Sequence, residues 1–206
     1  MIRKLVLYFA YFAIFMICFS NCQCNSYTLV PKTVNINTHL HFNIYVDQDF
    51  DSHEVDLIEQ ATSEWEEKTK NRVIFNIYYN FDLDNDRKII DRRHSIIFVK
   101  LSQESQKVAE LDEWINKGKE GHSKIIGLYT TQYNVPSILL VYDRMLGDTY
   151  YKGCVEHELG HAMKLDHLKK ENTLMYPSMK NGARFITDDD LQEFCELYHC
   201  KVSDLK

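Results

Sequence analysis

The chain of 206 residues has only three prolines and seven glycines, and no stretch is rich in proline, glycine or serine. Linkers between domains are commonly built from those residues, so no boundary is indicated inside the chain. We also find no internal repeat and no Asn-x-Ser/Thr site for glycosylation. The composition therefore favours a single folded domain once any leader has been removed.

Acidic residues outnumber basic ones, 30 to 24. The formal net charge is −6 at pH 7, and it becomes −8 when the first 22 residues, which contain Arg3 and Lys4, are left out. The sequence has no run of lysine and arginine that would follow a phosphate backbone. Nucleic acid is therefore not an expected partner.

No apolar run is long enough to cross a bilayer as a helix. Leu5–Phe19 has no charge, but a spanning helix needs about 20 apolar residues. A short apolar run after two basic residues is typical of a secretory signal peptide, which we assign to residues 1–22, with Ser20 and Cys22 at the minus-three and minus-one positions. The alternatives are a lipid attached to Cys22 and a leader that stays uncut as an anchor. If the signal peptide is cleaved and Cys22 carries no lipid, we expect a secreted, extracellular protein without a membrane attachment.

Six cysteines are present, and two of them, Cys18 and Cys22, lie in the expected signal peptide. The other four are Cys24, Cys154, Cys195 and Cys200. An even number in an exported protein predicts two disulfides, with three possible pairings. The alternative is that Cys154 and Cys195 are buried thiols on helix faces, because free cysteine packs as a small hydrophobic residue.

Apolar patterning predicts both strands and helices. Five segments have the pattern of β-strands: 40–46, 73–79, 95–101, 125–131 and 138–142. Helical spacing follows the capping pairs Asp51 with Glu54 and Thr187 with Asp190, and it recurs at 102–121 and 150–163. This order predicts an α+β fold in which long helices cover one face of a mixed sheet. We expect the domain to span residues 39–201, after an N-terminal arm of residues 23–38.

The most informative stretch is His157-Glu158-Leu159-Gly160-His161, inside the helix expected at 150–163. Residues four apart lie on one face of a helix, so His157 and His161 can direct their imidazoles at one metal ion. His167 is the natural third ligand, provided that the helix ends soon after His161 and the chain turns back. Glu193 and Glu196, on the last helix, are alternative third ligands. Three protein ligands are typical of catalytic zinc, which keeps a water in its fourth position.

These residues resemble the HExxHxxGxxH zinc signature of the metzincin endopeptidases. Thr173-Leu174-Met175-Tyr176-Pro177 is similar to the Met-turn of the matrixins, the matrix-metalloproteinase branch of that group, and lies at the same distance from His167. One position differs, because Lys164 stands where the family has a glycine in the left-handed conformation. That conformation costs a lysine on the order of 1 kcal/mol.

The resemblance implies an α+β, matrixin-like catalytic domain with a twisted, mixed five-stranded sheet and three main helices. It implies a monomeric zinc endopeptidase that hydrolyses protein or peptide substrates, with one catalytic Zn²⁺ on His157, His161 and His167. Zinc held by three imidazoles lowers the pKa of its bound water to about 7, and Glu158 would be the general base that accepts the proton of that water. The alternative function is a metzincin-like binding module without turnover, for which Lys164 is the only support in the sequence.

The resemblance also implies a substrate site. Met175 would form an apolar floor beneath the zinc, and an extended substrate would pair with the edge strand at Gly127–Thr130. The residues expected to contact the substrate come from two segments: Gly127, Leu128 and Tyr129 of the edge strand, and Tyr176, Pro177 and Met179 after the start of the Met-turn.

A calcium site is poorly supported. Asp82, Asp84 and Asp86 alternate like the first half of a calcium loop. Arg87 and Arg93, however, occupy the places of the turn glycine and the bidentate glutamate. The ligand pattern of the additional matrixin zinc and calcium sites is also missing, so we carry over no metal beyond the catalytic zinc.

Overall fold

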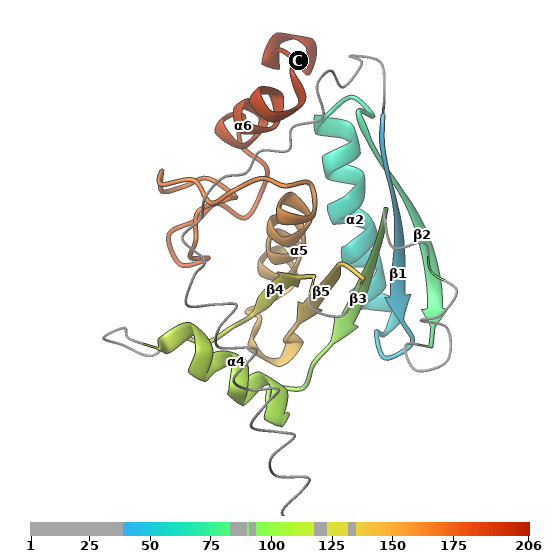
Figure 1. Ribbon diagram of the computed structural model, residues 1–206, viewed down its shortest axis with the longest axis vertical. Helices are drawn as coiled ribbons and strands as arrows, with labels where there is room; N and C mark the ends of the chain where they lie inside the picture. The colour runs from blue at the N-terminus through green and yellow to red at the C-terminus, as the bar shows by residue number, and fades with distance from the viewer. Residues whose placement is uncertain (1–38, 83–89, 91–93, 118–122, 132–134) are drawn as a thin grey trace, which may run out of the picture. The chain divides into compact units, whose positions relative to one another are not determined.

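The computed structural model describes residues 39–82, 90, 94–117, 123–131 and 135–206 (Figure 1). The expected signal peptide and N-terminal arm lie outside this part of the chain, and so does most of the acidic segment that contains Asp84 and Asp86. Within the described ranges, no helix combines the length and the apolar character that crossing a membrane requires.

Five strands form one mixed sheet, in the places that the apolar patterns predict. Their bounds are β1 Leu40–Asp47, β2 Val73–Phe81, β3 Ser95–Lys100, β4 Gly127–Thr130 and β5 Ser137–Leu140. The order across the sheet is β2-β1-β3-β5-β4. Neighbouring strands are parallel up to β5, and β4 pairs antiparallel with β5 at the edge. The predicted edge strand is therefore confirmed.

Four α-helices lie in the described part of the chain, together with two short 3₁₀ turns. The helices are α2 Ser52–Lys68, α4 Gln106–Asn116, α5 Asp148–Ala162 and α6 Asp188–Tyr198, and the turns are η2 Tyr142–Arg144 and η3 Val202–Asp204. The long helices α2 and α5 lie side by side on one face of the sheet (Figure 1). This arrangement confirms the predicted α+β class, and the shorter α4 adds to the three main helices.

Helix α2 connects the sheet to α5. It begins with the predicted capping box, in which Asp51 accepts the N–H of Glu54 and Glu54 accepts the N–H of Asp51. Its apolar stripe ends at Trp65, which is fully buried and whose indole N–H donates to the carbonyl of Glu156 at 3.0 Å. An aromatic ring of this size contributes a large buried apolar area. Trp65 therefore fixes α2 against α5 one residue before His157.

Among the described residues, one disulfide is present where two were predicted for the mature chain. Cys195 and Cys200 are bonded across the C-terminal end of α6, whereas Cys154 on α5 is a free, buried thiol. The prediction of a bridge through Cys154 was wrong, because its sulfur packs beneath β4, where a Cβ on Gly127 would lie 2.6 Å from it. Burial also raises the pKa of this thiol well above its usual value. Cys24 lies outside the described residues.

A hydrogen-bonded ion pair holds α4 against the segment that leads into β4. Both carboxylate oxygens of Asp112 accept from Arg144 at 2.8 Å. The same two side chains bind the backbone of Ile125, whose N–H donates to Asp112 and whose carbonyl accepts from Arg144. The side chains of Asp112 and Arg144 are only 21% and 11% exposed. The pair thus positions the start of the edge strand.

We predict that Asp112→Asn lowers the free energy of unfolding by about 2 kcal/mol at pH 7, because it leaves a largely buried guanidinium without its anion. Hydrogen bonds from Arg144 hold the pKa of Asp112 below its ordinary value of 3.8. The stabilisation is therefore present above that value and is lost as the pH falls through the lowered pKa. Urea unfolding should show the difference between parent and variant narrowing toward pH 3. A difference independent of pH would contradict this account, and exposed Asp204→Asn is the control.

Candidate metal centre

Helix α5 presents the first half of the centre. His157 and His161 are separated by one helical turn, and Glu158 lies between them in the sequence. The helix is buried along most of its length, which gives its interior residues little contact with water. His157 is buried, His161 is intermediate and His167 is exposed, so the three imidazoles run from the interior to the surface.

The end of α5 turns the chain back toward the helix. The N–H of Lys164 donates to the carbonyl of His161, and the N–H of Leu165 donates to that of Gly160. These two bonds are the Schellman arrangement, which places the residue after the C-cap in the left-handed conformation. That residue is Lys164, with φ of 69°. The predicted helix end and the left-handed lysine are both confirmed, and the turn brings His167 beside His157 and His161.

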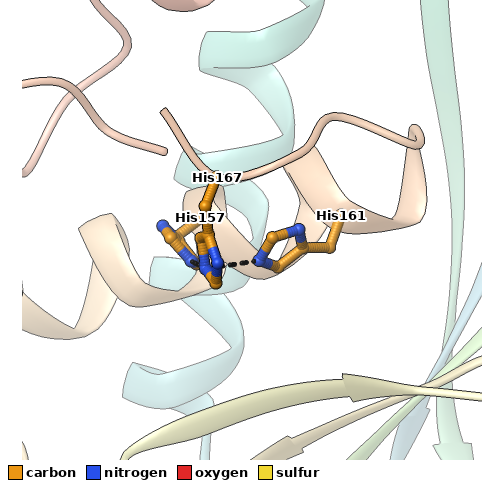
Figure 2. A group of neighbouring side chains, drawn as sticks. All are labelled: His157, His161 and His167. Carbon is orange, nitrogen blue, oxygen red and sulfur yellow. Dashed lines mark hydrogen bonds between the residues drawn. The ribbon is translucent and has the colours of Figure 1, made fainter. Parts of the chain in front are cut away.

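The three histidines point toward one common position (Figure 2). Nε2 of His167 lies 3.1 Å from Nε2 of His161 and 3.3 Å from Nε2 of His157. These three residues form a group whose ligand atoms all lie within 4.8 Å of one another. The metal-capable group found among the described residues includes neither Glu193 nor Glu196. The structure thus brings together the three histidines and leaves out the alternative ligands.

The chemistry of these rings fits a zinc ion. Nδ1 of His157 donates to the carbonyl of Leu174 at 2.6 Å, and Nδ1 of His161 donates to the carbonyl of Leu165 at 2.9 Å. A neutral imidazole that donates through Nδ1 has its lone pair on Nε2, where the rings converge. Burial lowers the pKa of His157 to about 4 and also lowers those of His161 and His167. All three rings therefore favour the neutral form that binds metal.

The Met-turn supports His157 from below, and Asp190 holds the Met-turn. The carboxylate of Asp190 accepts the N–H groups of Leu174 and Met175, each at 2.9 Å, as well as the N–H of Thr187. Asp190 is fully buried and is also the capping-box residue of α6. One side chain therefore connects the first turn of α6 to the peptide that orients His157.

Met175 lies directly against α5. It is fully buried, and a Cβ on Gly160 would be 2.4 Å from its sulfur. Only a glycine leaves room for this approach between the two zinc-signature histidines of the helix. After Met175, Tyr176 is half-buried, Pro177 is exposed and Met179 packs into the main core.

Glu158 lies between α5 and the edge strand. Its Oε2 accepts the N–H of Tyr129 at 2.6 Å, and its Oε1 would be 3.0 Å from a Cβ on Gly127. Burial raises the pKa of Glu158 to about 7, while the Tyr129 N–H acts in the opposite direction. The absence of a side chain at Gly127 is what allows β4 to approach this carboxylate.

The hydrogen-bonding groups of β4 alternate between β5 and the outer edge. Val141 donates to the carbonyl of Ile126 at 2.8 Å, and Leu128 lies opposite Leu139. Because residues in an antiparallel pair bond to the partner strand alternately, Gly127 and Tyr129 direct their backbone groups away from β5. The bond from Tyr129 to Glu158 agrees with this register. The outer edge of β4 therefore faces the candidate catalytic carboxylate.

Comparison with known families identifies this architecture. The family model of the matrixins matches residues 34–199 of the chain. The chain belongs to the matrixin family. This finding confirms the resemblance inferred from the zinc signature and the Met-turn, and it supports a zinc metallopeptidase.

Two solved structures are similar to this matrixin, at low sequence identity. Archaemetzincin from Methanopyrus kandleri is 11% identical, with a TM-score of 0.45, and the match covers 81% of this chain and 99% of that one. Metalloproteinase-II from Bacteroides fragilis is 14% identical, with a TM-score of 0.43, and the match covers 81% of this chain and 55% of that one. A search of curated proteins finds no match.

Two parts of the matrixin site were missed by sequence reasoning. Asp190 was expected only as a helix cap, and its bonds to the Met-turn join residues 15 and 16 positions apart. Tyr129 was expected only to contact a substrate, whereas its backbone N–H binds Glu158. The position of Asp190 as the third residue of a capped helix was the one sequence signal for its interaction with the Met-turn.

We predict that Asp190→Asn lowers the free energy of unfolding by about 3 kcal/mol, because an amide N–H₂ would then face backbone donors in a buried site. Zinc affinity should fall about tenfold, since the carbonyl that orients His157 loses its support. Denaturant unfolding and competition with a zinc chelator measure these two effects. Asp189→Asn, at a neighbouring half-exposed position that pairs with Lys170, should leave zinc affinity unchanged and cost less than about 1 kcal/mol. An Asp190→Asn variant with unchanged zinc affinity would contradict the proposed link.

We also predict that Lys164→Gly is more stable than Lys164→Ala by about 1 kcal/mol, because only glycine adopts a φ of 69° without a steric cost. Both variants lose the lysine side chain, so their difference isolates the backbone conformation. Denaturant unfolding of the two zinc-loaded proteins measures it. If the alanine variant were equally or more stable, as in an ordinary helical position, the left-handed conformation would be disproved.

Proposed function

We propose that this matrixin is an exported zinc endopeptidase that uses Glu158 as its general base. One observation carries the proposal: the buried carboxylate of Glu158, the residue next to His157 on α5, accepts the N–H of Tyr129 on the outer edge of β4. This arrangement puts a proton acceptor at the junction of a metal centre and a surface that can bind an extended peptide. Family membership supports the same class of activity.

His157, His161 and His167 would hold the zinc through Nε2. When bound, zinc lowers the pKa of a coordinated water to about 7 and polarises the carbonyl of the scissile bond. The protein keeps these rings neutral by burial and orients two of them through backbone carbonyls. Met175 would close the apolar floor of the site from below.

Glu158 would move the proton. Its Oε2 is occupied by the Tyr129 N–H, so Oε1 is the atom that we assign to accept the proton of the attacking water. A pKa that burial raises to about 7 in the metal-free protein suits a carboxyl that takes up that proton and then releases it to the leaving nitrogen. Burial, which raises this pKa, also excludes the bulk water that would compete for the proton.

The substrate would be a protein or peptide bound in extended form along β4. The backbone groups of Gly127 and Tyr129 face outward and can pair with a peptide strand. Leu128 lies between them in the strand. Tyr176, Pro177 and Met179 would line the wall of the pocket for the substrate side chain that follows the scissile bond. Displacement of the Tyr129 N–H by a substrate carbonyl would free Glu158 for proton transfer.

We further propose that the protein acts outside the cell as a monomer, after removal of residues 1–22. The Cys195–Cys200 disulfide suits an oxidising compartment. Attachment to a membrane would require a lipid on Cys22 or an uncut leader. No calcium requirement is proposed.

We predict that Glu158→Gln keeps its fold and its zinc but loses at least about 10³-fold in peptide hydrolysis, because glutamine can accept the Tyr129 N–H but cannot take a proton. Metal analysis and cleavage of a general peptide substrate measure the two properties. His167→Ala is the matched control, and it should lose zinc as well as activity. A zinc-loaded Glu158→Gln variant that cleaves at the parent rate would exclude Glu158 as the base. A zinc-loaded parent that binds peptides but never cleaves them would favour the binding-module function.

A further inference from the structure

Lys164 places a cation beside the side chain of Tyr129 on β4. Its backbone is fixed by the Schellman turn at the end of α5, and its side chain is exposed. The amine lies 5.6 Å from the centre of the Tyr129 ring. Tyr129 is also the residue whose backbone N–H binds Glu158. The lysine therefore reaches from the metal-binding helix to the strand proposed to hold the substrate.

The Lys164 ammonium can form an ion pair with an anionic group of a bound peptide. In the described part of the chain, Lys164 makes no ion pair within 4 Å, whereas exposed Lys170 and Lys206 each contact an aspartate. A contact with an aromatic face leaves the ammonium N–H groups available for hydrogen bonds to a carboxylate. The nearby Asp166 faces His161 and His167, where its charge partly opposes the lowering of their pKa by burial.

The identity of the residue is itself informative. A left-handed position after a helix favours glycine, and glycine is what the zinc signature of the family has there. A lysine at φ of 69° retains a steric cost that glycine would avoid. Strained backbone conformations cluster at active sites and ligand clamps.

We propose that Lys164 determines substrate specificity by binding an aspartate or glutamate side chain of the peptide segment that pairs with β4. This inference rests on the proposed function, because it takes β4 as the substrate strand. The acidic side chain would lie beside the Tyr129 ring and form an ion pair with the Lys164 ammonium. The substrates would then be proteins with an acidic residue near the cleaved bond.

The experiment uses peptides that differ only by glutamate or glutamine, with this residue placed in turn at each position around the cleaved bond. For the zinc-loaded parent, kcat/KM should favour glutamate about fivefold at one position, the upper end for an exposed ion pair. Lys164→Met, which keeps the apolar stem without the charge, should bring this ratio to about one, and Lys164→Glu should reverse it. Lys169→Met, at a nearby exposed lysine, should leave the ratio unchanged.

A parallel binding measurement separates this inference from the proposed activity. Fluorescence anisotropy with zinc-loaded Glu158→Gln reports the affinity of the same peptides without turnover. Suppose that the parent does not cleave, but that Glu158→Gln binds glutamate peptides more tightly than glutamine peptides. If adding Lys164→Met to this variant removes the preference, the proposed activity fails and the role of Lys164 stands. Three results would overturn the inference: equal affinity for the glutamate and glutamine peptides at every position, no peptide binding, or an equal increase in affinity for both peptides in Lys164→Met.

Discussion

The peptide group of Leu174 is the connection on which the geometry of the metal centre depends. Its carbonyl accepts the Nδ1–H of His157, and its N–H donates to the buried carboxylate of Asp190. Because Nδ1 carries the proton, Nε2 of His157 keeps its lone pair and faces the other two rings. Hydrogen bonds thus join the first turn of α6, the Met-turn and helix α5 into one unit. The orientation of His157 is determined by a side chain that lies far along the sequence and does not contact the metal position.

Close packing on α5 is the second constraint. Gly160 lets the Met175 sulfur reach the helix, and Gly127 lets β4 approach Glu158 and Cys154. The resulting exclusion of water changes the pKa values in opposite directions, lowering those of the histidines and raising that of Glu158. Both shifts favour the neutral forms of these groups when the metal is absent. In the proposed mechanism, the same burial would prepare the imidazoles to bind zinc and the carboxyl to exchange a proton near neutral pH.

Much of this arrangement could be predicted because it depends on local periodicity. Helical spacing places His157 and His161 on one face, and the family motif requires the left-handed turn that Lys164 adopts. The disulfides were less predictable, because four cysteines can pair in three ways. The packing of Cys154 beneath β4 is also a tertiary property, which the sequence does not reveal. The two interactions of Asp190 with the Met-turn could not be found from spacing, because the intervening loop has no regular period. The sequence thus predicts which residues carry the chemistry, and the tertiary structure adds what orients them.

The most direct test of the account is a zinc titration of the chelator-treated protein, followed by cleavage of casein. Since the three histidines form a single centre, hydrolysis should be absent without metal, rise in proportion to added zinc and stop rising at one equivalent. Chelator added afterwards should abolish it. A protein that binds one equivalent of zinc and leaves casein and general peptide substrates intact, or one that cleaves them equally well without zinc, would contradict the account.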